Sequence, residues 1–230
     1  MNPHGGQTGR EPTSFLKAQP FFQDSAHTSV ERELCPTRFP GCSAGAGPIT
    51  GFCDVLSGMP LYALGDLVPH IDPSAFIHPD AVLIGNVVVG PESSVWPTAV
   101  LRADHGGIRI GAQTSIQDGT VIHCTSTLDT VVGDRCTVGH NAHLEGCTIE
   151  DFCLIGSGSV VLHRAIIRSG SLVGAQALVP NDMEVPTGAM ALGIPAKIKH
   201  NAVTTEMLSF AADVYVGFAH QYHAELRRLD

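Results

Sequence analysis

Two histidines and one glutamate form the chemically most informative set in the sequence: His123, His140 and Glu145. Two imidazoles and a carboxylate can hold zinc in an open catalytic site, because three protein ligands leave a fourth position for water or substrate. The chain contains twelve histidines, so the simpler alternative is that each of these side chains is an ordinary surface group. The choice depends on whether the fold brings the three together.

A six-residue repeat runs through the middle of the chain and predicts where these side chains lie. Aliphatic residues recur every six positions, interrupted by two short insertions and one deletion. The column consists of Ile71, Ile77, Leu83, Val89, Val95, Leu101, Ile110, Ile116, Ile122, Val132, Val138, Leu144, Ile149, Ile155, Val161, Ile167, Val173 and Val179. A fixed period of this kind indicates a repeat architecture.

A second column of mostly small residues follows the aliphatic one at a distance of four positions, as at Ala75, Ala81, Thr114 and Ala177. A large and a small inward residue in each hexapeptide suit one flat side and one tight corner of a narrow triangular tube. The repeat therefore predicts an all-β fold, a parallel β-helix of about six three-sided coils that share one continuous core.

The repeat also places the candidate site residues. Arg102, His123 and Glu145 each follow the third aliphatic residue of a coil, so they stack on one side at the strand spacing of about 4.8 Å. His140 lies on the adjacent side and points away from this column within one chain. A threefold arrangement of tubes would bring it opposite the column of a neighbour, which predicts a homotrimer.

The regions outside the repeat differ from it in amino-acid composition and periodicity. Residues 1–58 are rich in Gly, Pro, Ser and Thr and are expected to be disordered, with Met59 as a possible true start. Residues 59–200 are expected to form the β-helix domain, with prolines breaking up its end after residue 180. Residues 201–230 show helical spacing from Thr204 onward and predict a C-terminal α-helix packed on the β-helix.

Composition excludes several functional classes. A net charge of −9 argues against nucleic-acid binding, which needs a basic face. No apolar run of about 18 residues is present, so no membrane span is expected. The first residues lack the layout of a secretion signal, and the seven cysteines form no CxxC pair. We therefore expect reduced cysteines and a cytoplasmic protein.

Four segments in this order resemble the gamma-class carbonic anhydrases: RAD at 102–104, IGAQTSIQDGTVIH at 110–123, TVGHNAHLEGCTI at 137–149 and LGIPAK at 192–197. The resemblance covers about residues 60 to 200 and implies a left-handed β-helix homotrimer. It also implies a metal at each subunit interface, zinc with iron or cobalt as alternatives, and interconversion of carbon dioxide and bicarbonate by a lyase of the carbonate dehydratase type.

The resemblance implies roles for individual residues. His123 and His140 match two of the three metal ligands of the family, and Gln117 matches the group that orients water or bicarbonate at the metal. Arg102 and Asp104 match an ion pair at the interface.

Asp118, beside Gln117, matches a residue that bonds across the interface. Arg102, Asp104 and Asp118 can equally be structural residues that only lock the trimer.

The chain departs from the family pattern at several positions. Glu145 stands where the third histidine ligand is expected, and His143 lies two residues earlier, off the column. Ser115 replaces a usual asparagine, and the tyrosine often found shortly before LGIPAK is absent. An anionic ligand donates more charge to the ion, so its water should stay protonated to higher pH than with three imidazoles. The expected site binds metal but hydrates carbon dioxide slowly.

Two other functional classes remain open. The first is an acyltransferase or acyl-CoA thioesterase, since such enzymes share the hexapeptide repeat, with His163 on the third side of its coil as the candidate base. The second is a non-catalytic trimeric binding or scaffold protein whose metal site has decayed.

Overall fold

The computed structural model describes residues 60–230, so the disorder expected for residues 1–58 lies outside the described residues. The strands are β1 Leu61–Tyr62, β2 His70–Ile71, β3 Phe76–Ile77, β4 Val82–Val89, β5 Ser94–Val95, β6 Val100–Ile110, β7 Ser115–Ile116, β8 Val121–His123, β9 Thr130–Val132, β10 Thr137–Val138, β11 His143–Glu145, β12 Thr148–Ile149, β13 Leu154–Ile155, β14 Val160–Val161, β15 Ile166–Ile167, β16 Leu172–Val173, β17 Leu178–Val179, β18 Glu184–Val185, β19 Met190–Leu192 and β20 Lys197–Lys199. They are followed by one helix, α1 Thr205–Glu225.

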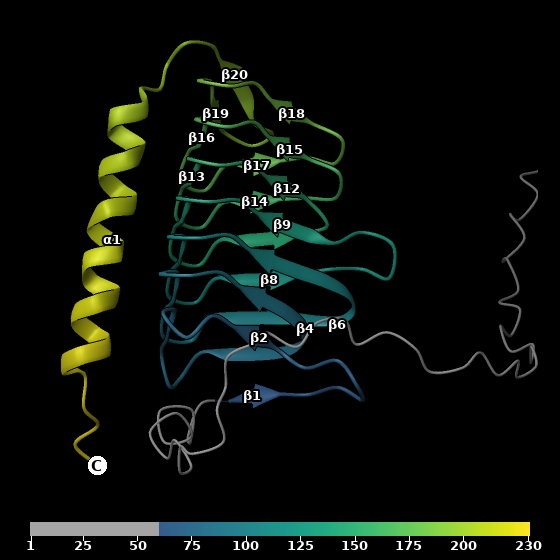
Figure 1. Cartoon of the computed structure of the whole chain (residues 1–230). Coiled ribbons are helices and arrows are strands. Elements are labelled where there is room, and N and C mark those ends of the chain that lie inside the picture. The colour runs from purple at the N-terminus through teal and green to yellow at the C-terminus, as the bar shows by residue number, and fades with distance from the viewer. Residues whose placement is uncertain (1–59) are drawn as a thin grey trace, which may run out of the picture. The chain divides into compact units, whose positions relative to one another are not determined.

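The strands form the three sides of a parallel β-helix, which confirms the predicted fold class (Figure 1). The helix side consists of β3, β5, β7, β10, β13, β16 and β19, with β20 added antiparallel at its end. The histidine side consists of β1, the first halves of β4 and β6, and β8, β11, β14 and β17. The charged side consists of β2, the second halves of β4 and β6, and β9, β12, β15 and β18.

The predicted aliphatic column fills the axis of the tube. Its members from Ile77 to Val179 are at most 3% exposed, and Ile71 in the first coil is partly buried. The chain turns at the third residue after many of these aliphatic residues, where the backbone adopts positive φ, for example 57° at Asn141 and 67° at Gly158. Asn and Gly tolerate this conformation better than most residues.

The β-helix is longer than predicted, with about seven turns in place of about six. Val185 and Ala191 continue the inward column beyond Val179 and are fully buried. Pro180 and Pro186 do not end the repeat, because each stands directly after a two-residue strand, where no ladder hydrogen bond has to be donated.

Helix α1 packs on the helix side, as the sequence predicts, and runs alongside the early coils (Figure 1). Ala219 is 2% exposed and packs with Phe76 and Trp96, and the Tyr222 ring lies 5.0 Å from the Trp96 ring. Within residues 60–230 no helix is long and apolar enough to cross a membrane. The described cysteines are buried free thiols, in agreement with the sequence: Cys124, Cys136, Cys147 and Cys153.

Candidate metal centre

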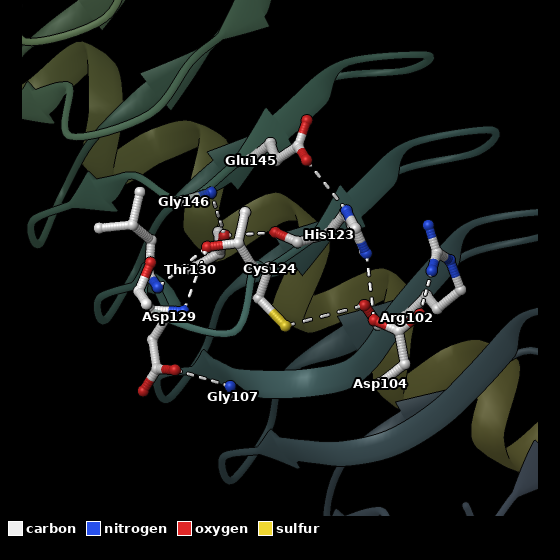
Figure 2. A network of polar contacts seen from close by, with 12 residues as sticks. Arg102, Asp104, Gly107, His123, Cys124, Asp129, Thr130, Glu145 and Gly146 are labelled. Atoms are coloured by element: carbon white, nitrogen blue, oxygen red, sulfur yellow. Dashed lines mark hydrogen bonds and ion pairs between the residues drawn. The ribbon is translucent and has the colours of Figure 1, made fainter. Parts of the chain in front are cut away.

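The structure places Arg102, His123 and Glu145 in register on the histidine side. Arg102 of β6 pairs with His123 of β8, and His123 pairs with Glu145 of β11. The three side chains therefore rise from successive coils in one column, as the repeat predicts (Figure 2).

Both ring nitrogens of His123 face carboxylates. Its Nδ1 lies 3.0 Å from Oε1 of Glu145, and its Nε2 lies 3.2 Å from Oδ1 of Asp104. Asp104 in turn accepts a hydrogen bond from the Arg102 guanidinium of the same chain (Figure 2). Burial acts to raise the pKa of Asp104, but the contacts with His123 and Arg102 outweigh it and lower that pKa overall.

Glu145 has two further histidine neighbours that the sequence did not assign to it. Its Oε2 lies 3.3 Å from Nε2 of His143, and its Oε1 lies 3.6 Å from Nε2 of His163. The hydrogen bond with His123 is the main cause that lowers the pKa of Glu145, while burial opposes it and the contacts with His143 and His163 add to it. The carboxylate is therefore held as an anion by surrounding imidazoles.

A buried hydroxyl fixes the backbone behind the column. Thr130 of β9 donates a hydrogen bond to the carbonyl oxygen of His123 and accepts one from the N–H of Gly146, at 2.8 Å (Figure 2). These partners lie at the ends of β8 and β11, so one side chain ties the two site strands together. No sequence motif marks Thr130, since threonine also fills many corner positions.

The other predicted site residues lie away from the column. His140 is half exposed, and its Nδ1 contacts Oδ2 of Asp118 at 2.8 Å, in the same chain. Gln117 is buried on the helix side. Within one chain, His140 therefore contacts Asp118, whereas His123 contacts Glu145 and Asp104.

A tyrosine from α1 reaches Gln117. Burial raises the pKa of the Tyr215 phenol, with the Asp118 charge adding to the effect and the nearby Gln117 amide opposing it. Before LGIPAK, where the resemblance implies a tyrosine, the inward residues are Ala189 and Ala191. A helical segment docked on the tube supplies a phenol from elsewhere in the chain.

Ser115 has a structural partner in place of a site partner. Its hydroxyl oxygen accepts a hydrogen bond from the Trp96 indole N–H at 2.9 Å, under α1. Ser115 therefore supports the packing of α1 on the helix side.

The side chains of the column remain accessible from outside, with 21% of His123 and 24% of Glu145 exposed. Within residues 60–230 of one chain, no three His, Cys, Asp or Glu side chains are already grouped around a common point as metal ligands would be. A metal centre therefore needs a donor from a second copy, a rearrangement of this cluster, or both.

Comparisons with known proteins assign this chain to a protein family. Residues 129–163 match the family model described as bacterial transferase hexapeptide (six repeats). The carnitine operon protein CaiE of Escherichia coli is 38% identical over 149 residues, which cover 65% of this chain and 76% of CaiE. The chain belongs to the hexapeptide-repeat family. Its relatives in that family carry the names CaiE and gamma carbonic anhydrase, which confirms the resemblance noted in the sequence.

Two further members illustrate the range of the hexapeptide-repeat family. Gamma carbonic anhydrase 2 of Arabidopsis thaliana, a mitochondrial protein, is 36% identical over 167 residues, which cover 69% of this chain but only 60% of the plant protein. A solved hexapeptide transferase family protein from Anaplasma phagocytophilum is 33% identical, with a TM-score of 0.68, and the match covers 72% of this chain and 99% of that one.

Proposed function

We propose that three copies of this chain assemble through their histidine sides and hold a divalent metal at each interface, with zinc as the first candidate. The site would interconvert carbon dioxide and bicarbonate, or act on a similarly small substrate, at a slow rate. The observation that carries this proposal is the contact between His123 and Glu145, two metal-ligating side chains in register on one outer side of the tube.

The histidine side has the surface expected of an interface between copies. Val100, Val121, Val160 and Leu178 point outward in one column beside the site, with His143 between Val121 and Val160, and Val121 is 39% exposed. An outward aliphatic column on an uncovered side favours burial against another protein surface.

The other two sides are already occupied or solvated. The helix side is covered by α1. The charged side carries a ladder in which Arg168 contacts Glu150 at 2.7 Å and Glu184 at 2.9 Å. The outward column of this side alternates Val88, Val131 and Ile166 with Arg109, Thr148 and Glu184, so it is more polar than that of the histidine side. The histidine side is therefore the better candidate for contact with neighbouring copies.

The donors fit a divalent metal such as zinc, which binds imidazole nitrogens and carboxylate oxygens. His123 and Glu145 of one copy and His140 of the next would hold the ion, and a bound zinc would supply an acidified water near neutral pH. Asp104 and Arg102 fix the ring of His123, in the manner of the carboxylate partners of metal-ligating histidines. Gln117, buried on the helix side near Tyr215, would orient the substrate.

An acyl-transfer function is the second candidate, since the matched family model is named for transferases. A hollow of about 500 Å³, lined by residues that include Ser126, Asp129 and Arg164, lies next to the site. Gly146 lines it, and the ring of His163 lies close to Gly146. Release of free coenzyme A from acyl-CoA by metal-free protein would favour this candidate over the first.

Metal analysis of the purified chain and two variants tests the proposal. We expect about one divalent ion per chain, bound more weakly in both His123→Ala and His140→Ala because each removes one ligand of a shared site. His70→Ala, on the charged side, is the control and should keep the ion.

Mixed trimers of the two variants provide the sharper test. Co-expressed His123→Ala and His140→Ala subunits should regain part of the metal, because some interfaces then contain both histidines. Full metal content in His140→Ala would show that the ligands do not come from two copies. A natural protein without bound metal would favour the function of a non-catalytic scaffold.

The cytoplasmic location of the protein stays a prediction.

A further inference from the structure

The imidazole of His163 has an unusual position beside the column. It comes from the coil after Glu145, two residues past the inward Val161 of β14. Its Nε2 is buried and has no hydrogen-bond partner among the described residues. The 3.6 Å to Oε1 of Glu145 is longer than a hydrogen bond. A buried ring nitrogen without a partner costs free energy, so this atom is placed for a ligand that the chain alone does not supply.

The same carboxylate oxygen faces two histidines. Oε1 of Glu145 lies 3.0 Å from Nδ1 of His123 and 3.6 Å from Nε2 of His163. Ligand bonds of 2.0–2.1 Å in a tetrahedral zinc site separate neighbouring donor atoms by about 3.3 Å. The two observed separations bracket that value, so each imidazole is spaced from the carboxylate as two donors of one ion would be.

The other oxygen of Glu145 is held separately. His143 contacts Oε2 at 3.3 Å, and this contact is a hydrogen bond. His143 therefore has a partner and orients the carboxylate, as side chains around metal ligands commonly do, whereas His163 has none.

We infer that His163 is a metal ligand that replaces the imidazole missing at position 145. The inference rests on the proposed function. The ion would be held by His123 and His163 from one copy and His140 from a neighbouring copy, with Glu145 as an additional anionic ligand. The chain alone shows no grouped set because the ion and the neighbouring histidine are needed to draw the donors together.

A four-donor set has a chemical consequence. Tetrahedral zinc is filled by four protein ligands, and catalytic sites keep one position open. Glu145 therefore occupies the position that water needs, and its removal leaves three imidazoles and an open site. Without His163 as a ligand, the loss of Glu145 would leave only two imidazoles, too few to retain the ion.

The experiment measures Zn²⁺ and Co²⁺ binding by the full chain in which Glu145 is replaced. We expect Glu145→Ala to keep about one ion per chain and to change the visible spectrum of bound Co²⁺, because one ligand is lost. In that background, a second change His163→Ala should abolish binding, whereas His143→Ala, the matched control histidine, should leave it within a few fold. Glu145→Gln repeats the test with nearly unchanged shape, should Glu145→Ala not assemble.

The outcomes separate the inference from the proposed function. If the natural protein binds metal but both Glu145 variants lose it, His163 is not a ligand, and the three-ligand interfacial site stands. If His163→Ala and His143→Ala behave alike in the Glu145→Ala background, the inference is also wrong. If the natural protein binds no metal, the proposed function itself fails.

Discussion

At the scale of single residues, one carboxylate determines the chemistry of this site. Glu145 contacts three imidazoles, and its pKa is lowered chiefly by the hydrogen bond with His123. In a three-ligand site, a carboxylate that stays ionised donates negative charge to the cation and weakens the effect of the cation on the pKa of water. In the four-donor set that we infer, the carboxylate also takes the coordination position of that water. Slow hydration is the expected result.

Replacement of this carboxylate should therefore increase activity. With His163 as a ligand, Glu145→Gln should retain metal and hydrate carbon dioxide at least about tenfold faster than the natural protein near pH 7, a change of only ~1.4 kcal/mol in barrier. Stopped-flow measurement with a pH indicator gives the rate, and Glu150→Gln on the charged side is the control. Rapid hydration by the natural protein, or a fully metallated Glu145→Gln without any gain, would contradict the argument.

At the scale of elements, α1 is a separate layer on a tube that has its own core. Its contacts are with outward side chains of the helix side, and Arg135 joins Asp213 of the helix at 2.6 Å. Trp96 is the single tryptophan of the chain and is 6% exposed under the helix. Its fluorescence therefore reports whether α1 is docked.

A charge placed under α1 should detach it without unfolding the tube. Ala219→Asp puts a carboxylate among Phe76 and Trp96, and burial of an unpaired charge costs several kcal/mol. We expect a red shift of Trp96 emission with unchanged β-type circular dichroism. Phe210→Asp, at a side chain 72% exposed on the same helix, should leave the emission unchanged. An unshifted spectrum of Ala219→Asp would mean that the helix is not the cover of Trp96.

The six-residue period explains which parts of the site could be predicted. Each hexapeptide advances the chain by one side, so the stacking of Arg102, His123 and Glu145 follows from counting. The contact of His163 with Glu145 could not be predicted by counting. His163 lies at a corner just before Arg164, where φ is 59°, and the period does not determine the direction of a side chain there. The Tyr215 contact with Gln117 depends on how a helix docks, which no repeat encodes.

At the scale of the whole molecule, the three sides of the tube differ in what they can meet. One is covered by α1, one carries the Glu150–Arg168–Glu184 ladder, and one presents aliphatic side chains beside the candidate metal ligands. Neighbouring copies packed on the histidine side would bury the aliphatic column and complete the metal site in the same step. Assembly and metal binding should therefore be lost together.

A charge in the aliphatic column tests this coupling. Val121→Glu places a carboxylate on the histidine side of every copy, and a dry interface with unpaired charges is disfavoured by several kcal/mol. Val131→Glu makes the same change at an outward position on the charged side and is the matched control. We expect light scattering to give a metal-bound trimer for the natural protein and for Val131→Glu. Val121→Glu should be folded, largely monomeric and poor in metal. A Val121→Glu trimer with full metal content would place the interface elsewhere, and a monomeric natural protein would remove the shared site altogether.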